Sequence, residues 1–395
     1  MPFHSHFLKR SLKTVNKTEK LYFKDAYLSA FSARVLSVAE VEGGYEVVLD
    51  KTAFFPSEAG QSADTGKLAG ANVLDVYERE GVIYHLTDNM LPVGESVRGE
   101  IDFDIRFEKM QCHTAEHLLS GLLYERYGVD NVGFHLGEYE VTFDTSRRMS
   151  AEELMKIEAE ANAVIYKNLP VSAEIYDCEE AIGSHYRSKR AIAGQVRIVT
   201  ILGVDSCACC APHVARTGEI GIIKILREQS YKGGSRICML AGKRAYDFIT
   251  KLYKTAQNAS SALSYPILEI ADGIARRDEE IKELKLALRE SERSRLLAGI
   301  PTLSQSGRQV IFADTDDASL ARECANLLLE KADELAVVLY RAGAGVGFVM
   351  LGREDVGAIC KKATLALGGR GGGRGPMAQG SFSSDISEII EYFNS

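Results

Sequence analysis

Apolar and polar residues alternate through residues 18–100, with short interruptions at glycine-containing turns. The pattern is clear in "FSARVLSVAEVEGGYEVVLD" and again in "GKLAGANVLDVYEREGVIYHLTD". Successive side chains of a strand point to opposite faces, so a period of two indicates strands with one buried face. We therefore expect residues 18–100 to form short antiparallel strands, arranged as a small N-terminal barrel.

The pattern changes to helical spacing beyond residue 105. The run "RFEKMQCHTAEHLLSGLLYERYG" predicts a helix that stops at Tyr127-Gly128. Further on, Ser150 followed three residues later by Glu153 is a capping box that opens a second helix. Strand-like segments such as "EYEVTFD" and "QVRIVTILG" accompany these helices. Residues 101–248 are therefore predicted to form a mixed domain of helices and strands.

Two further segments and an extension complete the predicted organisation. Residues 249–298 are charged and helical in pattern, as in "DEEIKELKLALRESERSRLLAG", and predict a helical linker. Residues 299–395 alternate strand-like and helix-like pieces around "GGRGGGRGPMAQG", which predicts a C-terminal α/β domain. Residues 1–17 are basic and lack this patterning, so we expect a flexible extension. The predicted fold class is α+β.

Composition narrows the classes of function. No apolar run reaches 18 residues and no signal-peptide core is visible, so we expect a cytoplasmic protein without a membrane span. The eight cysteines are spread along a long chain and do not indicate a disulfide framework. The net charge of −8 argues against indiscriminate nucleic-acid binding. A local basic segment is nevertheless a candidate for phosphate contacts, with solvated surface as the alternative: Arg187, Lys189, Arg190 and Arg197.

Two histidine-containing pairs are candidate metal ligands. His113 and His117 lie four residues apart in "HTAEH", which places them on one helix face about 6 Å apart. Cys209 and His213 have the same spacing in "CCAPH". Together they offer imidazole and thiolate ligands of the kind that zinc prefers.

The spacing alone leaves three interpretations open. "HTAEH" also reads as H-x-x-E-H, a metallopeptidase pattern in which Glu116 would be the general base. Successive helix residues are rotated by roughly 100° about the axis, so Glu116 faces away from the ligand pair. The alternative to a general base is therefore a solvent-facing or tethering carboxylate. Four protein ligands also fit a closed structural zinc in a non-enzymatic RNA-binding protein. Cys207 and Cys210 are either substitute ligands for Cys209 or free thiols.

Several separated motifs resemble one family. "HTAEHLLSGLL" lies some 90 residues before "CxxxHVxxTGEIG", and this order is similar to the editing domain of alanyl-tRNA synthetase and to the free-standing alanyl-tRNA editing proteins of the AlaX group. "TAFFPSEAGQSADTG" resembles the family's glycine-rich stretch. "LGGRGGGRGPMAQG" resembles the signature of the DHH-associated C-terminal domain found in long AlaX proteins. A DHH phosphoesterase is improbable because the acidic Asp-His-His module is missing.

The resemblance implies a zinc-dependent deacylase. It implies hydrolysis of the ester that links serine or glycine to the 3′ end of alanine tRNA, with one zinc ion held by His113, His117, Cys209 and His213. ATP binding is a further property of the synthetase family. The family's Gly-Gly-Gln is Ala59-Gly60-Gln61 here, and its C-x-G-T-H is altered between Cys209 and His213. With about a hundred residues before the histidine helix, we expect editing without charging of tRNA.

Contacts to the substrate are predicted from the same motifs. Gln61 and Thr52 are expected to hold the amino acid, and His135 to approach the serine hydroxyl or the tRNA terminus. Because size cannot exclude alanine from a serine pocket, we expect a buried partner for the serine hydroxyl among Thr52, Gln61, Thr114 and His135. Arg370 and Arg374 of the glycine-rich run are candidate RNA contacts, with a flexible linker as the alternative. A homodimer through the linker and the C-terminal domain is also predicted.

Overall fold

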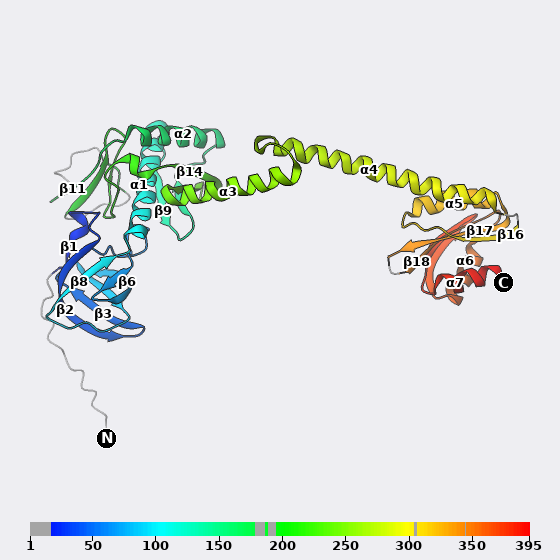
Figure 1. Cartoon of the computed structure of the whole chain (residues 1–395), viewed down its shortest axis with the longest axis horizontal. Helices are drawn as coiled ribbons and strands as arrows, with labels where there is room; N and C mark the ends of the chain where they lie inside the picture. The colour runs from blue at the N-terminus through cyan, green and yellow to red at the C-terminus, as the bar shows by residue number, and fades with distance from the viewer. Residues whose placement is uncertain (1–16, 178–185, 189–194, 304–305, 344) are drawn as a thin grey trace, which may run out of the picture. The chain divides into compact units, whose positions relative to one another are not determined.

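The computed structural model describes residues 17–177, 186–188, 195–303, 306–343 and 345–395, and it divides into two compact units, Met1–Thr255 and Ala256–Ser395. Each unit contains both helices and sheets, so the predicted α+β class is confirmed (Figure 1). Within the described residues, no helix is both long enough and apolar enough to cross a membrane.

The first part of unit one is a closed barrel of six strands. The strands are hydrogen-bonded in the order β2-β3-β7-β6-β5-β8, and neighbours are antiparallel. Alternation explains the barrel, since every second residue of β8 is buried and its neighbours are exposed. Their bounds are β2 Ala30–Val41, β3 Gly44–Leu49, β5 Gly66–Leu68, β6 Ala71–Arg79, β7 Val82–Thr87 and β8 Ser96–Ile101. Before and beside the barrel, β1 (Glu19–Lys20) pairs in parallel with β4 (Lys51–Thr52), and η1 covers Leu21–Phe23.

The second part of unit one is built around α1, Phe103–Tyr127. This helix ends at Gly128 in the left-handed conformation (φ 62°), as the Tyr-Gly stop predicts. The residues from Met110 to Leu123 are all buried, which makes α1 the centre of the largest apolar core of this unit. The capping box of Ser150 and Glu153 is also confirmed, and it opens α2, Ala151–Lys167.

Two small sheets pack around α1. One has the order β14-β15-β10-β9, and the other has the order β11-β12-β13. The strand bounds are β9 Asn131–Leu136, β10 Val141–Thr145, β11 Val171–Tyr176, β12 Val196–Ile201, β13 Asp205–Ala208, β14 Ile223–Tyr231 and β15 Gly234–Ala241, and η3 covers Thr217–Ile220. The cysteine-rich turn follows β13 directly.

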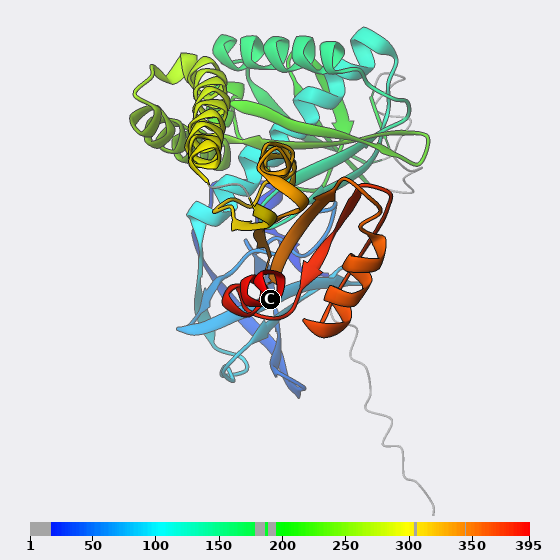
Figure 2. The same cartoon turned by 90° about the vertical axis from the view of Figure 1, so that its right-hand side faces the viewer.

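Unit two contains a five-stranded sheet with helices on both faces (Figure 2). Alternate residues of β17 face opposite layers: Val337 packs in the core of α6 and α7, whereas Val338 packs in the core of α5. The strand order is β16-β17-β18-β20-β19. The bounds are β16 Ser306–Phe312, β17 Ala332–Ala342, β18 Gly345–Gly352, β19 Gly369–Arg374, β20 Met377–Phe382, α5 Ala318–Leu329, α6 Gly357–Ala366 and α7 Ile386–Asn394.

Helices precede this sheet in the chain, and the glycine-rich run forms one of its two edge strands. The helices are α3 Gly242–Leu263, which spans the unit boundary, then η4 Ile267–Glu269, α4 Ile270–Gly299 and η5 Ile300–Thr302. The run containing Arg370 and Arg374 forms β19 at the sheet edge, so the flexible-linker alternative is wrong. Its glycines allow close backbone contact, because a Cβ on Gly373 would lie 2.0 Å from the carbonyl oxygen of Met377.

One buried histidine inside the barrel predicts a pH-dependent stability. Burial lowers the pKa of His85 to about 4, and the ring lies between the carbonyl oxygen of Val47 (3.1 Å) and the hydroxyl of Thr52 (2.8 Å). Above pH 6.5 the ring is neutral in both states. Below it, the unfolded chain binds the proton first, so unfolding becomes easier as the pH falls from 6.5 to 4.

We therefore expect His85 to remove roughly 3 kcal/mol of stability across this pH range. The measurement is the free energy of unfolding of wild type and His85→Gln at several pH values. The variant retains every other acid titration, so the difference between the two curves isolates His85. Parallel curves between pH 6.5 and 4 would contradict the expectation.

Candidate metal centre

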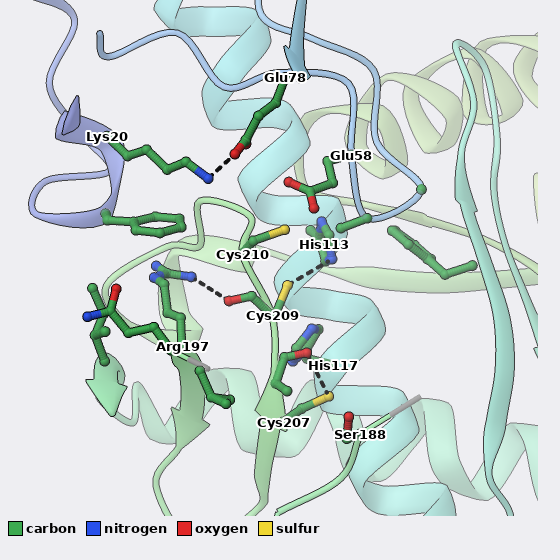
Figure 3. A pocket seen from close by; sticks show the side chains of 18 of the residues that line it. Lys20, Glu58, Glu78, His113, His117, Ser188, Arg197, Cys207, Cys209 and Cys210 are labelled. Atoms are coloured by element: carbon green, nitrogen blue, oxygen red, sulfur yellow. Dashed lines mark hydrogen bonds and ion pairs between the residues drawn. The ribbon is translucent and has the colours of Figure 1, made fainter. Parts of the chain in front are cut away.

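The four side chains predicted as metal ligands converge in the structure. His113 and His117 project from one face of α1, and Cys209 and His213 come from the turn after β13 (Figure 3). One ligand atom from each of the four lies within 4.8 Å of the others. The Cys209 Sγ is 3.4 Å from Nε2 of His213 and 3.6 Å from Nε2 of His113. All three histidines are buried.

Hydrogen bonds orient the first imidazole. Nδ1 of His113 donates to Oε1 of Gln61 at 3.0 Å, which leaves Nε2 with a lone pair directed towards Cys209. Gln61 comes from the barrel, in a tight turn that is held to β9 by the bond from Leu136 N to the carbonyl oxygen of Gly60 (2.8 Å). The barrel thus sets the orientation of a ligand on α1.

Thr114 orients His213 in the same way. Its hydroxyl donates to the carbonyl oxygen of Met110 (2.8 Å) and accepts from the amide of Val214 (3.2 Å). A hydroxyl has one proton, so it accepts from Nδ1 of His213 at 3.0 Å. Nε2 of His213 is then also free as a ligand.

The third imidazole faces a buried ion pair. Nδ1 of His117 lies 3.5 Å from Oδ2 of Asp205. Arg187 donates two hydrogen bonds, of 2.7 and 2.8 Å, to the same carboxylate. Burial opposes ionisation of Asp205, but His117 and Arg187 outweigh it and lower the pKa of this carboxyl group. The Sγ of Cys207 and one ligand atom each of His117 and Asp205 all lie within 4.8 Å of one another. This arrangement is a carboxylate behind a metal-binding histidine.

The donor set fits zinc. Burial lowers the pKa of His213 to about 3, so its imidazole is neutral. Burial would raise the pKa of the Cys209 thiol, but His113 and the other imidazoles lower it well below its usual range. The pKa of His117 is raised by Cys207 and Asp205 against the effect of burial, so metal binding there displaces a proton. Imidazole nitrogen and thiolate sulfur are ligand types that zinc binds, and four of them match its usual coordination number.

Three of the four candidate ligands, His113, His117 and Cys209, line a cavity of about 1060 Å³. Phe134 of β9 packs against the His113 ring with 4.7 Å between ring centroids. Glu58 and Cys210 lie on the same side of His113 (Figure 3). Burial, with Cys209 and Glu58, raises the pKa of the Cys210 thiol, so it stays protonated.

None of the four predicted substrate residues lines this cavity. Thr52 is fully buried in the barrel, where its hydroxyl contacts His85 and the amide of Phe54. Thr114 is committed to His213. His135 is exposed and follows Phe134 on β9, so it points to the opposite face of the strand. Gln61 contacts His113 and Thr114 contacts His213, so both adjoin the cluster, and contact of Gln61 with the amino acid stays a prediction.

The predicted basic residues have other partners. Arg187 binds Asp205, and Arg197 donates to the carbonyl oxygens of Cys209 and Ala211, each at 2.9 Å. Arg197 is buried and also stacks on Phe23, so it supports the ligand turn. Arg187 and Arg197 are thus engaged within the protein, and their contact with phosphates stays a prediction. Lys189 and Arg190 lie outside the described residues. Arg370 and Arg374 are exposed on β19.

The expectation of a solvent-facing Glu116 is also wrong. Glu116 is 3% exposed, and its Oε1 accepts hydrogen bonds from Ser120 (2.6 Å) and from Asn131. Its Oε2 lies 3.9 Å from Nε2 of His117. Oε1 therefore ties α1 to β9, which matches the tethering alternative.

Five contributors were missed from the sequence. Glu58 and Phe134 line the cavity, Asp205 lies beside His117, and Arg106 of α1 binds Asp64 in the barrel loop. The only available signal was position: Glu58 and Asp64 lie in the glycine-rich stretch, and Asp205 lies four residues before Cys209.

We expect Asp205→Asn to weaken zinc binding about 10- to 100-fold, because it removes the charge behind His117. The measurement is competition with a chromophoric chelator, with thermal unfolding recorded separately. Asp144→Asn is the matched control, because Asp144 binds Arg236 through the same two-bond pair at 2.7 and 2.8 Å. Equal zinc affinity of Asp205→Asn and Asp144→Asn would disprove the orienting role.

Comparison with known proteins gives one family. Residues 196–237 match the model of the threonyl and alanyl tRNA synthetase second additional domain, and they include Cys209 and His213. The chain is 31% identical over 397 residues to an alanine–tRNA ligase of Pyrobaculum calidifontis, covering 95% of this chain and 44% of the ligase. A Halobacterium salinarum alanine–tRNA ligase is 35% identical over 308 residues, or 72% of this chain and 33% of the ligase.

The chain thus spans less than half of the ligases that it matches. In contrast, the alanyl-tRNA editing protein AlaX-L of Pyrococcus horikoshii is matched along nearly its whole length: 28% identity over 403 residues, 94% of this chain and 96% of that protein. The full-length match, the matched synthetase domain and the four clustered ligands together place the chain in the family of the AlaX-type alanyl-tRNA editing proteins.

Proposed function

We propose that this protein is a zinc-dependent hydrolase that removes serine or glycine from mischarged alanine tRNA. One observation carries the proposal: three buried imidazoles and a thiolate form one cluster, and three of its members, His113, His117 and Cys209, line a cavity of about 1060 Å³. The name of the Pyrococcus horikoshii relative, an alanyl-tRNA editing protein, supports the substrate class. The cavity favours a catalytic site over a closed structural zinc, since a substrate can approach the ligands.

The reaction is hydrolysis of an ester. Water attacks the carbonyl carbon, the bond to the ribose oxygen breaks, and that oxygen takes up a proton. Zinc held by the four ligands would supply Lewis acidity to the carbonyl or to the water. The chain supplies the orientation: Gln61 and Thr114 fix the rings of two ligands, and Arg197 holds the turn of Cys209.

Selection of serine over alanine is assigned to Gln61. Its Oε1 is bound to His113, whereas its buried Nε2 has no hydrogen-bond partner among the described residues. The serine hydroxyl would give this donor a hydrogen-bond partner, whereas the alanyl ester would leave it buried and unpaired. Binding of the correctly charged alanyl ester is therefore penalised. Thr52 and Thr114 are not part of this proposal because their hydroxyls are bonded to His85 and His213, and His135 is left out because it points to the strand face opposite Phe134.

The remaining features of the proposal concern domains and RNA. We propose a barrel (18–100), a zinc-binding editing domain (101–248), a helical linker (249–298) and a C-terminal DHH-associated domain (299–395). The proposed RNA contacts are Arg370 and Arg374, which are exposed on β19 of the C-terminal domain, together with Lys189 and Arg190. A homodimer through the linker and the C-terminal domain, and ATP binding, also stay predictions.

The decisive test is release of labelled amino acid from alanine tRNA carrying serine, glycine or alanine. We expect serine and glycine to be released, serine much faster than alanine, and the activity to be lost with a zinc chelator and restored by zinc. A peptide substrate serves as the control for the metallopeptidase alternative. Absence of turnover of all three esters by folded, zinc-loaded protein would refute the proposal.

We expect Gln61→Ala to lower the ratio of serine release to alanine release about tenfold, because the selective donor is lost. The assay is run at saturating zinc, so that a weaker metal site does not limit either ester. His135→Ala is the control and should leave the ratio unchanged. An unchanged ratio in Gln61→Ala would mean that another group selects serine.

A further inference from the structure

The charged groups that line the cavity differ in whether they have protein partners. Glu19 pairs with Lys24 at 2.6 Å, and Glu78 pairs with Lys20 at 2.7 Å. The buried Glu116 is bound by the side chains described above. Glu58 also lines the cavity, and its side-chain partner is the uncharged Cys210 thiol; among the described residues no Lys or Arg forms an ion pair with it. A carboxylate is therefore left without a cation on this wall of the cavity.

A rigid turn places Glu58 beside the ligand cluster. The amide of Glu58 donates to the carbonyl oxygen of Gln61 (3.1 Å), and the amide of Gln61 donates to that of Glu58 (2.9 Å). The two residues between them, Ala59 and Gly60, have φ of 54° and 76°. Both central residues have positive φ, as in a type I′ turn. Glu58 and Gln61, the residue that orients His113, are thus fixed to one another.

The turn is also fixed against β9. A Cβ on Gly60 would lie 2.4 Å from the carbonyl oxygen of Phe134, so only glycine permits this approach. The carboxylate of Glu58 points towards His113 and Cys210 (Figure 3). Backbone contacts fix the main chain of Glu58, so its carboxyl group stays within reach of the cluster before any substrate arrives.

An aminoacyl ester carries a cation close to its reacting carbon. Its α-nitrogen is two bonds from the carbonyl carbon, a separation of about 2.5 Å. The free amino group is an ammonium or is readily protonated near neutral pH. When the ester carbonyl lies at the ligand cluster, the α-nitrogen lies within a few ångströms of it. Glu58 is the carboxylate on that wall that is free to pair with an ammonium.

We infer that Glu58 binds the α-ammonium of the aminoacyl group and makes a free amino group a condition for fast hydrolysis. This inference rests on the proposed deacylase function and adds the group that recognises the amino end of the substrate. A charged hydrogen bond between carboxylate and ammonium is about twice as strong as a neutral one. An ester whose nitrogen is acylated has no such charge, so the enzyme would spare peptidyl and other N-acylated esters.

The test compares two substrates that differ at the nitrogen: seryl and N-acetylseryl esters of alanine tRNA. We expect wild type to cleave the seryl ester about 10- to 100-fold faster, as kcat/KM. Glu58→Gln should lose most of that factor on the seryl ester and keep the wild-type rate on the acetylated one. Glu58 is exposed, so the substitution should not affect folding.

Glu19→Gln is the matched control, because Glu19 lines the same cavity but already pairs with Lys24. It should keep the wild-type preference for the free amino group. The inference is overturned if Glu58→Gln retains that preference, or if it slows both esters equally. If wild type cleaves neither ester, the proposed function fails first and the inference falls with it; cleavage of both esters by wild type at equal rates overturns the inference alone.

Discussion

The buried ion pair between Arg106 and Asp64 joins the barrel to the helix that carries two of the candidate ligands. Arg106 is completely buried, binds both carboxylate oxygens of Asp64, and donates to the carbonyl oxygens of Ala26 (3.0 Å) and Ala53 (2.6 Å). Asp64 also accepts from the amide of Phe55 at 2.6 Å. Burying two charges is costly unless every donor and acceptor is satisfied, and losing one partner costs about 3–5 kcal/mol. The pair thus permits one placement of α1 on the barrel loop.

That placement determines the site, because the loop supplies groups that α1 lacks. Asp64 and Gln61 belong to the same short segment, so the ion pair that positions α1 also brings Gln61 to His113. Lys109, one turn further along α1, donates to the carbonyl oxygen of Ala63 at 2.6 Å and holds the segment a second time. The ligand cluster is therefore a product of the contact between barrel and helix.

Short sequence patterns predicted those features of the structure that depend only on neighbouring residues in the chain. The spacing of His113 and His117 places them on one face of any helix, and the stop at Gly128 and the capping box of Ser150 are properties of short sequences. The contacts of Thr52 and His135 depend on which strand face each residue occupies in the folded sheet, and His135 is one position away from the cavity-lining Phe134. Asp205 and Arg187 meet only after β13 has paired with the segment containing Arg187, so no spacing in the sequence predicts their ion pair.

The arginines near the cluster show why a cationic residue beside a candidate site is weak support for phosphate binding. A buried turn that presents Cys209 exposes carbonyl oxygens to the protein interior, and each needs a donor. Arg197 satisfies two of them, and Arg187 neutralises a carboxylate that faces His117. Both arginines would have to break internal bonds before they could bind a phosphate, which costs more than a free surface lysine would lose. With a net charge of −8, the proposed RNA binding would rely mainly on other cations, whereas Arg187 and Arg197 maintain the geometry of the candidate ligands.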